Sequence, residues 1–351
     1  MLRYAILACA LAAPVHSTAE RGRIVLNGVW RFQPVAAEAA PVPEGWGLIR
    51  VPGSWKDAAR TAGIVSRGAG RSWEGFGDGT AAVWYDRPVQ VPAAWAGRRI
   101  ILAVHRLSTD ADVFANGRPC GRISWPQGEA DLTDAVRPGD SAELRLKVVA
   151  VADAAQVLRV MGPGAGQQET GAAALEGKGL IGDVLLESRP SRAWIVDVFI
   201  RTSVAHRELA LDVETAGLPR SGSIQFTARL LNPFGRTERV LRASAAAPAG
   251  SGSVTVAWPW PDPRLWEAGA PELYELVLEA RGPGLDDAIR RTFGFREFAV
   301  AGKHFMLNGT EIRLRPVHPD REQWGGAAGT VEHVRGVLAG LRYAGFNLVV
   351  L

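Results

Sequence analysis

The feature that most constrains the fold of this chain is a two-residue alternation of apolar and polar side chains that recurs in short segments. It is clearest over residues 143–148, 209–214 and 224–229. Successive side chains of a strand point to opposite faces, so each segment predicts a half-buried β-strand. Tight turns are predicted at three Asn-Gly dipeptides, which begin at residues 27, 116 and 308. We therefore predict that residues 20 to about 315 are almost entirely β.

A boundary is predicted near Pro190, which follows an apolar strand segment and precedes the new series that starts at Trp194. Proline lacks a backbone N–H and does not fit a central strand. The block 191–297 has the length and about the seven strands of an immunoglobulin-like sandwich. The block 20–190 has the size of a larger sandwich such as a jelly roll.

The pattern changes in the block 298–351. Thr330 is a predicted N-cap and Gly345 a predicted helix stop. Between them one helical face carries Val331, Val334, Val337, Leu338, Leu341 and Ala344. The apolar run 346–351 is typical of a parallel strand buried on both faces. One βα unit cannot close a barrel, so we expect this to be the front of a longer α/β domain, or to pair with something that supplies the rest.

The first nineteen residues predict a secretory signal peptide. Arg3 precedes an apolar run over residues 4–13, and small residues follow up to Ala19. The run is about ten residues long, whereas a membrane span needs about twenty. Cys9 as a lipid attachment site is a minor alternative. Cleavage after Ala19 predicts a secreted or periplasmic protein with Cys120 as its one cysteine, which excludes an intramolecular disulfide.

Charge and composition exclude several classes of protein. With 40 Lys and Arg against 36 Asp and Glu, the net charge is +4, which is too small an excess to indicate a nucleic-acid-binding protein. The six histidines are scattered and form no His-Glu-x-x-His motif, so we expect no metal and no other cofactor. No apolar stretch after residue 20 is long enough to span a membrane.

Nine short segments carry a family resemblance; in chain order they are 26–32, 51–55, 113–117, 179–184, 263–266, 271–274, 293–296, 305–309 and 345–347. In this order they resemble the N-terminal part of glycoside hydrolase family 2, the β-galactosidases, β-glucuronidases and β-mannosidases. The resemblance implies a jelly-roll sugar-binding-type sandwich (20–190), an immunoglobulin-like sandwich (191–297) and the first βα unit of an incomplete (β/α)8 barrel (298–351).

The resemblance implies a retaining β-glycosidase. Such an enzyme needs two carboxyl groups about 5 to 5.5 Å apart, a general acid and a nucleophile. In the family the acid is a Glu that follows an Asn, and no Asn-Glu occurs here. We therefore expect no catalytic residue in this chain, and interpret Glu311 and Glu332 as surface charges.

Substrate-binding candidates follow the first predicted barrel strand. His318 and Asp320 lie where the family carries a substrate-binding His, and by spacing Asp320 takes that position. Pro316 stands where the family usually has Gly, and a polar loop without a ligand is the alternative interpretation. Trp324 is a candidate to stack on a sugar ring or, equally, to cover the barrel rim.

Two Gly-rich loops add Asp78 and Glu176 as binding candidates, with a solvent-exposed insertion as the alternative. Two family positions that bear on the choice of sugar are occupied by Ala173 and Val350 instead of Asp and Arg. The expected partner is a β-linked oligosaccharide or glycoside. A carbohydrate-binding or adhesive protein without hydrolysis is the alternative function, and the exposed apolar strand at 346–351 favours the enzyme.

Overall fold

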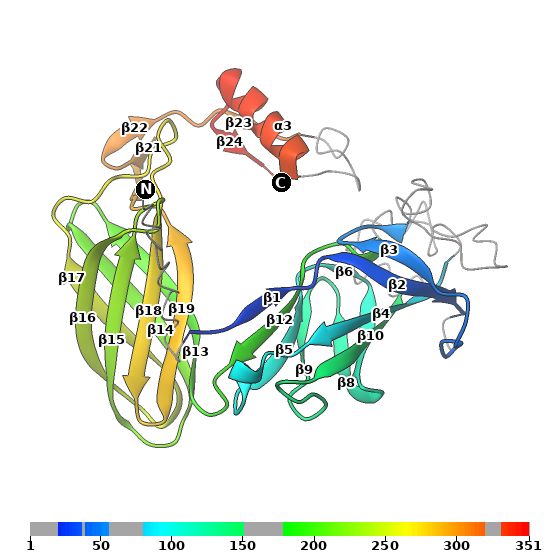
Figure 1. Cartoon of the computed structure of the whole chain (residues 1–351). Coiled ribbons are helices and arrows are strands. Elements are labelled where there is room, and N and C mark those ends of the chain that lie inside the picture. The colour runs from blue at the N-terminus through cyan, green and yellow to red at the C-terminus, as the bar shows by residue number, and fades with distance from the viewer. Residues whose placement is uncertain (1–19, 37–38, 56–79, 151–177, 320–330, 351) are drawn as a thin grey trace, which may run out of the picture.

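The computed structural model describes residues 20–36, 39–55, 80–150, 178–319 and 331–350. Most of these residues lie in strands that form two sandwiches, joined at one end and followed by a small α/β segment (Figure 1). The prediction of a mostly β chain is confirmed. The proposed signal peptide lies outside the described residues.

The first sandwich contains two antiparallel sheets. The larger sheet has the order β3-β2-β4-β10-β7-β8, and its strands are β2 (Gly28–Val35), β3 (Gly47–Val51), β4 (Ala82–Gln90), β7 (Asp110–Ala115), β8 (Arg118–Ser124) and β10 (Ser141–Val149). The smaller sheet has the order β1-β12-β5-β9, and its strands are β1 (Arg23–Val25), β5 (Arg99–Val104), β9 (Gly128–Asp131) and β12 (Val184–Arg189). A short pair, β6 (Leu107–Ser108) and β11 (Gly179–Leu180), and a 3-10 turn, η1 (Ala93–Trp95), complete it.

The alternation in the sequence builds the core of this sandwich. In β10, Leu144, Leu146 and Val148 are buried, and on the opposite sheet Ile100 and Leu102 of β5 belong to the same apolar cluster. Fully burying one such side chain contributes about 1.5–3 kcal/mol. The core therefore fixes which face of each strand points inward.

The second sandwich has its own core. Its sheets have the orders β13-β14-β17 and β16-β15-β18-β19, and its strands are β13 (Trp194–Ser203), β14 (Glu208–Leu218), β15 (Gly222–Leu231), β16 (Thr237–Ala247), β17 (Gly250–Pro259), β18 (Tyr274–Gly282) and β19 (Leu285–Phe293). Trp260 closes one end, with its ring centroid 5.0 Å from that of Tyr274 and 5.3 Å from that of Phe295. Because the two apolar clusters share no residue, each sandwich is stabilised by its own core.

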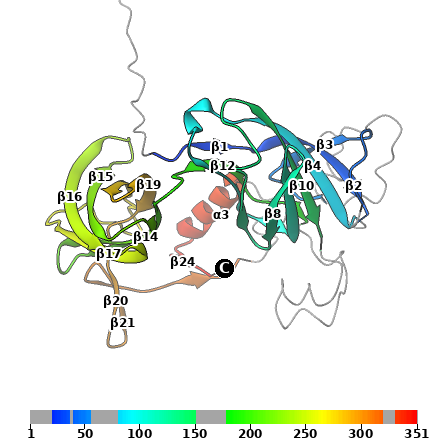
Figure 2. The same cartoon turned by 90° about the horizontal axis from the view of Figure 1, so that it is seen from below.

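The carboxyl-terminal segment begins with an antiparallel sheet of β20 (Phe298–Ala301), β21 (His304–Leu307) and β22 (Thr310–Ile312). This sheet projects beyond the second sandwich (Figure 2). Then follow β23 (Pro316–Val317), the helix α3 (Val331–Tyr343) and β24 (Leu348–Val349), and the two strands pair in parallel. The predicted helix and parallel strand are confirmed, and Gly345, at φ 88°, lies just beyond the helix.

The apolar side chains of this segment are only partly covered. Val334, Val337 and Leu341 are half-buried, but Leu348 stays 38% and Val350 44% exposed. The strand β24 is therefore open to solvent, as expected for a single βα unit, because one helix covers only one side of a two-stranded sheet.

Two of the predicted turns link neighbouring strands with the expected geometry. Asn116 and Gly117 have φ of 50° and 76° between β7 and β8, and Asn308 and Gly309 have 54° and 80° between β21 and β22. Asparagine and glycine tolerate this left-handed region, so the dipeptides determine where these hairpins reverse.

Candidate functional site

The edge at the end of β23 carries the one predicted site residue that the structure describes. The parallel ladder of β23 and β24 is extended by a hydrogen bond from the Val350 N–H to the Val317 carbonyl at 2.9 Å. His318 follows directly and is exposed, and Pro319 after it is buried. The carboxyl ends of both strands lie at this edge, which is where α/β barrels place their sites.

Asn347 fixes the two strands of this edge relative to each other. Its Oδ1 accepts a hydrogen bond from the Arg315 backbone N–H at 2.7 Å, and its Nδ2 donates to the Arg313 carbonyl at 2.9 Å. This side chain therefore ties the approach to β23 to the start of β24, which holds His318 at the edge.

The other predicted binding residues, Asp320, Trp324, Asp78 and Glu176, lie outside the described residues. Glu311 is half-exposed and its carboxylate lies 2.9 Å from His304 Nδ1. Glu332 is exposed on α3. Both carboxylates therefore lie on the surface of the described chain.

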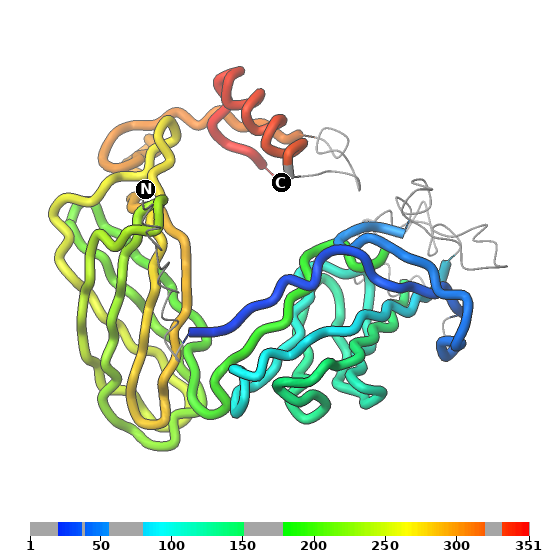
Figure 3. The backbone as a smooth tube through the Cα atoms, viewed as in Figure 1, coloured from blue at the N-terminus to red at the C-terminus, as the bar shows by residue number. Residues whose placement is uncertain are grey.

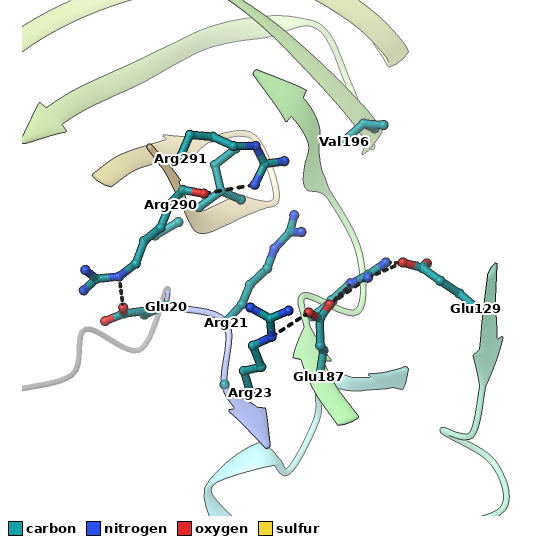
Figure 4. A pocket seen from close by; sticks show the side chains of 12 residues that line it. Glu20, Arg21, Arg23, Glu129, Glu187, Val196, Arg290 and Arg291 are labelled. Carbon is teal, nitrogen blue, oxygen red and sulfur yellow. Dashed lines mark hydrogen bonds and ion pairs between the residues drawn. The ribbon is translucent and has the colours of Figure 1, made fainter. Parts of the chain in front are cut away.

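A second candidate is a polar groove of about 520 Å3 at the junction of the two sandwiches (Figure 4). Its walls come from the segment before β1, from β9 and β12 of the first sandwich, and from β13 and β19 of the second. An adjoining groove of about 440 Å3 shares Glu129, Glu187 and Arg189 with it.

Arg189 is the centre of the ion pairs on the first-sandwich side. Its guanidinium donates to both oxygens of Glu129 at 2.7 and 2.6 Å and to Glu187 at 2.8 Å. The hydrogen bonds from Arg189 hold the pKa of Glu129 below its usual range, and those to Glu129 raise the pKa of Arg189. Glu129 is therefore ionised at neutral pH.

Arg21 makes the corresponding contacts with the second sandwich. Its Nε and Nη2 lie 3.2 and 2.7 Å from the two carboxylate oxygens of Asp287, whose side chain is fully buried. Arg21 Nη2 also donates to the Ile195 carbonyl, and the Ile195 N–H donates to Asp287 at 2.9 Å. Arg290 donates to Glu20 at 2.7 Å and to Glu275 at 2.9 Å.

These contacts decide what the groove can do chemically. Retaining hydrolysis needs one carboxyl group that is protonated and a second that is free to attack. Glu20, Glu129 and Glu187, which line the groove, are each paired with an arginine. Two of these pairs lie within the first sandwich, and the charged contacts with the second sandwich come from Glu20 and Arg21. The ion pairs of the groove therefore hold the segment before β1 between the two sandwiches.

Sequence reasoning did not find the groove. A signal was present in two charged stretches, 20–23 and 187–189, which flank the predicted signal peptide and the predicted boundary. Within the described ranges, His, Cys, Asp and Glu side chains form no group of three or more that could hold a metal ion. A search of the same ranges finds no helix with both the length and the hydropathy that a bilayer span requires.

Comparison with known proteins adds a family relationship. Residues 193–296, almost the whole second sandwich, match the family Glycosyl hydrolases family 2. The fold is similar to Bacteroides uniformis β-glucuronidase (TM-score 0.66, 21% identity, 94% of this chain and 39% of that one). It is also similar to a glycosyl hydrolase family 2 member from Bacteroides cellulosilyticus, with a TM-score of 0.67 and 19% identity over 93% of this chain and 44% of that one. A third similar structure is Bifidobacterium dentium β-glucuronidase complexed with coumarin-3-O-glucuronide. Its TM-score is 0.67 and its identity 25%, over 93% of this chain and 56% of that one.

This chain therefore spans between 39% and 56% of the length of these three structures. The resemblance to glycoside hydrolase family 2 that the motifs indicated is confirmed.

Proposed function

We propose that this relative of glycoside hydrolase family 2 is the N-terminal part of an exported, retaining β-glycosidase that hydrolyses O-glycosyl bonds in carbohydrates. The observation that carries the proposal is the likeness to family 2 structures over at least 93% of the chain, together with the family match of the second sandwich. The alternative, a non-hydrolytic carbohydrate-binding or adhesive protein, is not favoured by these relatives.

We further propose that the chain divides into a jelly roll (20–190), an immunoglobulin-like sandwich (191–297) and the start of a (β/α)8 catalytic barrel (298–351). The β23–α3–β24 unit supports the last part because its strands are parallel. Its exposed apolar side chains support it too, since an α/β domain would cover them.

The proposed site lies at the carboxyl edge of β23. His318 would contact substrate hydroxyls there, together with Asp320 and Trp324, which follow it in the sequence, and with Asp78 and Glu176 of the block 20–190. The catalytic carboxylate pair would be supplied from outside this chain. A glucuronide is bound in one of the similar structures, so β-glucuronides are the first class of substrate to test.

The test compares the 351-residue chain with the complete product of its gene on aryl β-glucuronides, β-galactosides and β-mannosides. We expect turnover by the complete product and covalent trapping of one carboxylate by an activated 2-deoxy-2-fluoro glycoside. The 351-residue chain alone should show neither.

If the 351-residue chain hydrolysed a glycoside and lost that activity when a carboxylate within 298–351 was replaced, this result would contradict the proposal that the catalytic carboxylates come from outside this chain. Glycan binding by the complete product without any turnover would support the adhesive alternative.

A further inference from the structure

We infer that residues 20–25 form a strap that crosses from the second sandwich to the first and fixes the angle between them. The tube in Figure 3 runs from the side of the second sandwich directly into β1 of the first. The chain otherwise passes between the sandwiches through residues 190–193, between β12 and β13. The strap is thus a second connection, made by side chains and backbone hydrogen bonds.

The beginning of the strap binds the second sandwich. Glu20 forms an isolated parallel bridge with Ala288 of β19, and its carboxylate accepts a hydrogen bond from Arg290 at 2.7 Å. Arg21 is held by Asp287 and by the Ile195 carbonyl. Two strands of the second sandwich, β13 and β19, are therefore bound by two adjacent residues.

The next residues bind the first sandwich. The Gly22 N–H donates to Ser188 Oγ at 2.9 Å, and the Ser188 N–H donates to the Gly22 carbonyl at 2.8 Å. From residue 23 on, β1 pairs with β12 in antiparallel register. A Cβ atom at Gly22 would clash with the Trp95 indole, so the strap lies directly against η1 and only glycine fits there.

Arg21 is the residue on which the joint depends. Asp287 is fully buried and Arg21 is 20% exposed, so replacing the arginine with a neutral residue would remove the cation that hydrogen-bonds this buried carboxylate and leave Arg98 as its charged neighbour. Breaking a buried pair at one partner is strongly destabilising, whereas exposed pairs contribute little. A rotation of one sandwich relative to the other that separated Arg21 from Asp287 would cost the same free energy. The pair therefore restricts the angle between the two sandwiches.

Cleavage after Ala19, as predicted from the sequence, would keep Glu20 and Arg21 in the mature chain. Cleavage two residues later would remove Glu20 and Arg21. The strap itself does not depend on the proposed glycosidase function.

The test measures the distance between the sandwiches in the full chain. Spin labels are placed by Asp134→Cys in the first sandwich and Ser221→Cys in the second, two exposed positions outside the joint, with Cys9 and Cys120 replaced by Ser. Arg21→Gln is compared with Arg201→Gln. Arg201 is a matched control because it makes a similar two-point pair with Asp212, at 2.7 and 3.0 Å, on an exposed face.

We expect Arg21→Gln to broaden the distance distribution and to speed hydrogen exchange in 20–25 and 184–189 by about tenfold or more, because local opening becomes easier. Arg201→Gln should change neither. If Arg21→Gln does not fold, Arg21→Lys keeps the charge beside Asp287 and should broaden the distribution less. An unchanged distribution in whichever of these Arg21 variants folds would overturn the inference, even if that variant had lost stability.

Discussion

Glu297 links the second sandwich to the segment that would carry the active site, and its replacement gives a sharp test of that link. Its Oε2 accepts hydrogen bonds from the backbone N–H groups of Val204 and Ala205 at 2.7 and 3.0 Å and from Ser203 Oγ at 3.0 Å. Its own N–H donates to Asn308 Oδ1 at 2.9 Å. One carboxylate therefore closes the β13–β14 turn, and the same residue holds the β21–β22 turn.

The expected loss follows from these contacts. Glu297→Ala removes the acceptor for two backbone N–H groups and one hydroxyl. A buried donor left unsatisfied costs about 1–3 kcal/mol, and hydrogen bonds to charged groups contribute about 1.5–3 kcal/mol. Since Glu297 is only half-buried, water can replace some of the lost hydrogen bonds, and we expect the free energy of unfolding to fall by about 1–3 kcal/mol in total. Glu297→Gln keeps an acceptor oxygen and should lose about half as much.

The loss should also depend on pH. The hydrogen bond from Ala205 is the largest influence on the pKa of Glu297 and, with those from Ser203 and Val204, holds it below its ordinary value of 4.5. A carboxyl whose pKa is depressed by folding stabilises the protein above its unfolded pKa. This stabilisation is lost as the pH falls through the folded pKa. The difference between the wild-type protein and Glu297→Ala should therefore shrink below about pH 4.5.

Urea unfolding at pH 7 and at pH 3, together with hydrogen exchange of residues 203–207, measures both effects. Glu214→Ala is the control, because Glu214 is an exposed carboxylate in the middle of β14. An unfolding midpoint of Glu297→Ala equal to that of the control would refute the reasoning. A stability difference that stays constant from pH 7 to pH 3 would refute the electrostatic part of it.

Two further predictions concern the cores and the turns. Phe226→Ala should lower the free energy of unfolding by about 3–5 kcal/mol, because the Phe226 side chain is 1% exposed. Phe199 is 66% exposed, so Phe199→Ala should change the free energy of unfolding by less than about 0.5 kcal/mol. Urea titration followed by tryptophan fluorescence compares the two variants. Asn116→Ala and Asn116→Gly both lose the hydrogen bonds that the Asn116 side chain makes with Glu143 and Ala135. Glycine adopts the φ of 50° without strain and alanine does not, so Asn116→Ala should destabilise the protein by about 1 kcal/mol more than Asn116→Gly. Calorimetric melting temperatures of the two variants measure this difference.

The parts of the fold that could be predicted are those encoded by neighbouring residues. Alternation over 143–148 predicts β10, and Asn116 with Gly117 predicts the next hairpin turn, because period and turn chemistry are local properties. The helix α3 was predicted for the same reason. Sheet order was out of reach, since pairing such as that of β1 with β12 joins residues about 160 positions apart.

The candidate site was harder to predict than the fold. Of the binding candidates that the resemblance indicated, the described residues include His318, which follows β23 at the carboxyl edge of the parallel pair. The polar groove went unpredicted because its principal ion pair joins Arg21 to Asp287, 266 positions away. The charged stretch 20–23 includes Arg21 but does not identify Asp287 as its partner, so only the folded chain shows the pair.

The small sheet β20–β22 shows why the segment after residue 297 differs from the sandwiches. Phe298 pairs with Leu307 and Val300 with Phe305, so all four side chains share one face. Yet Phe298 is 53% and Val300 65% exposed, and neither belongs to the apolar cluster of the second sandwich. The same face carries Ile312 and Thr310 of β22. A three-stranded sheet with a largely apolar face gains stability when that face is covered. The sandwiches meet this requirement internally, so the stability of residues 298–350 should rise when an α/β partner region covers this face.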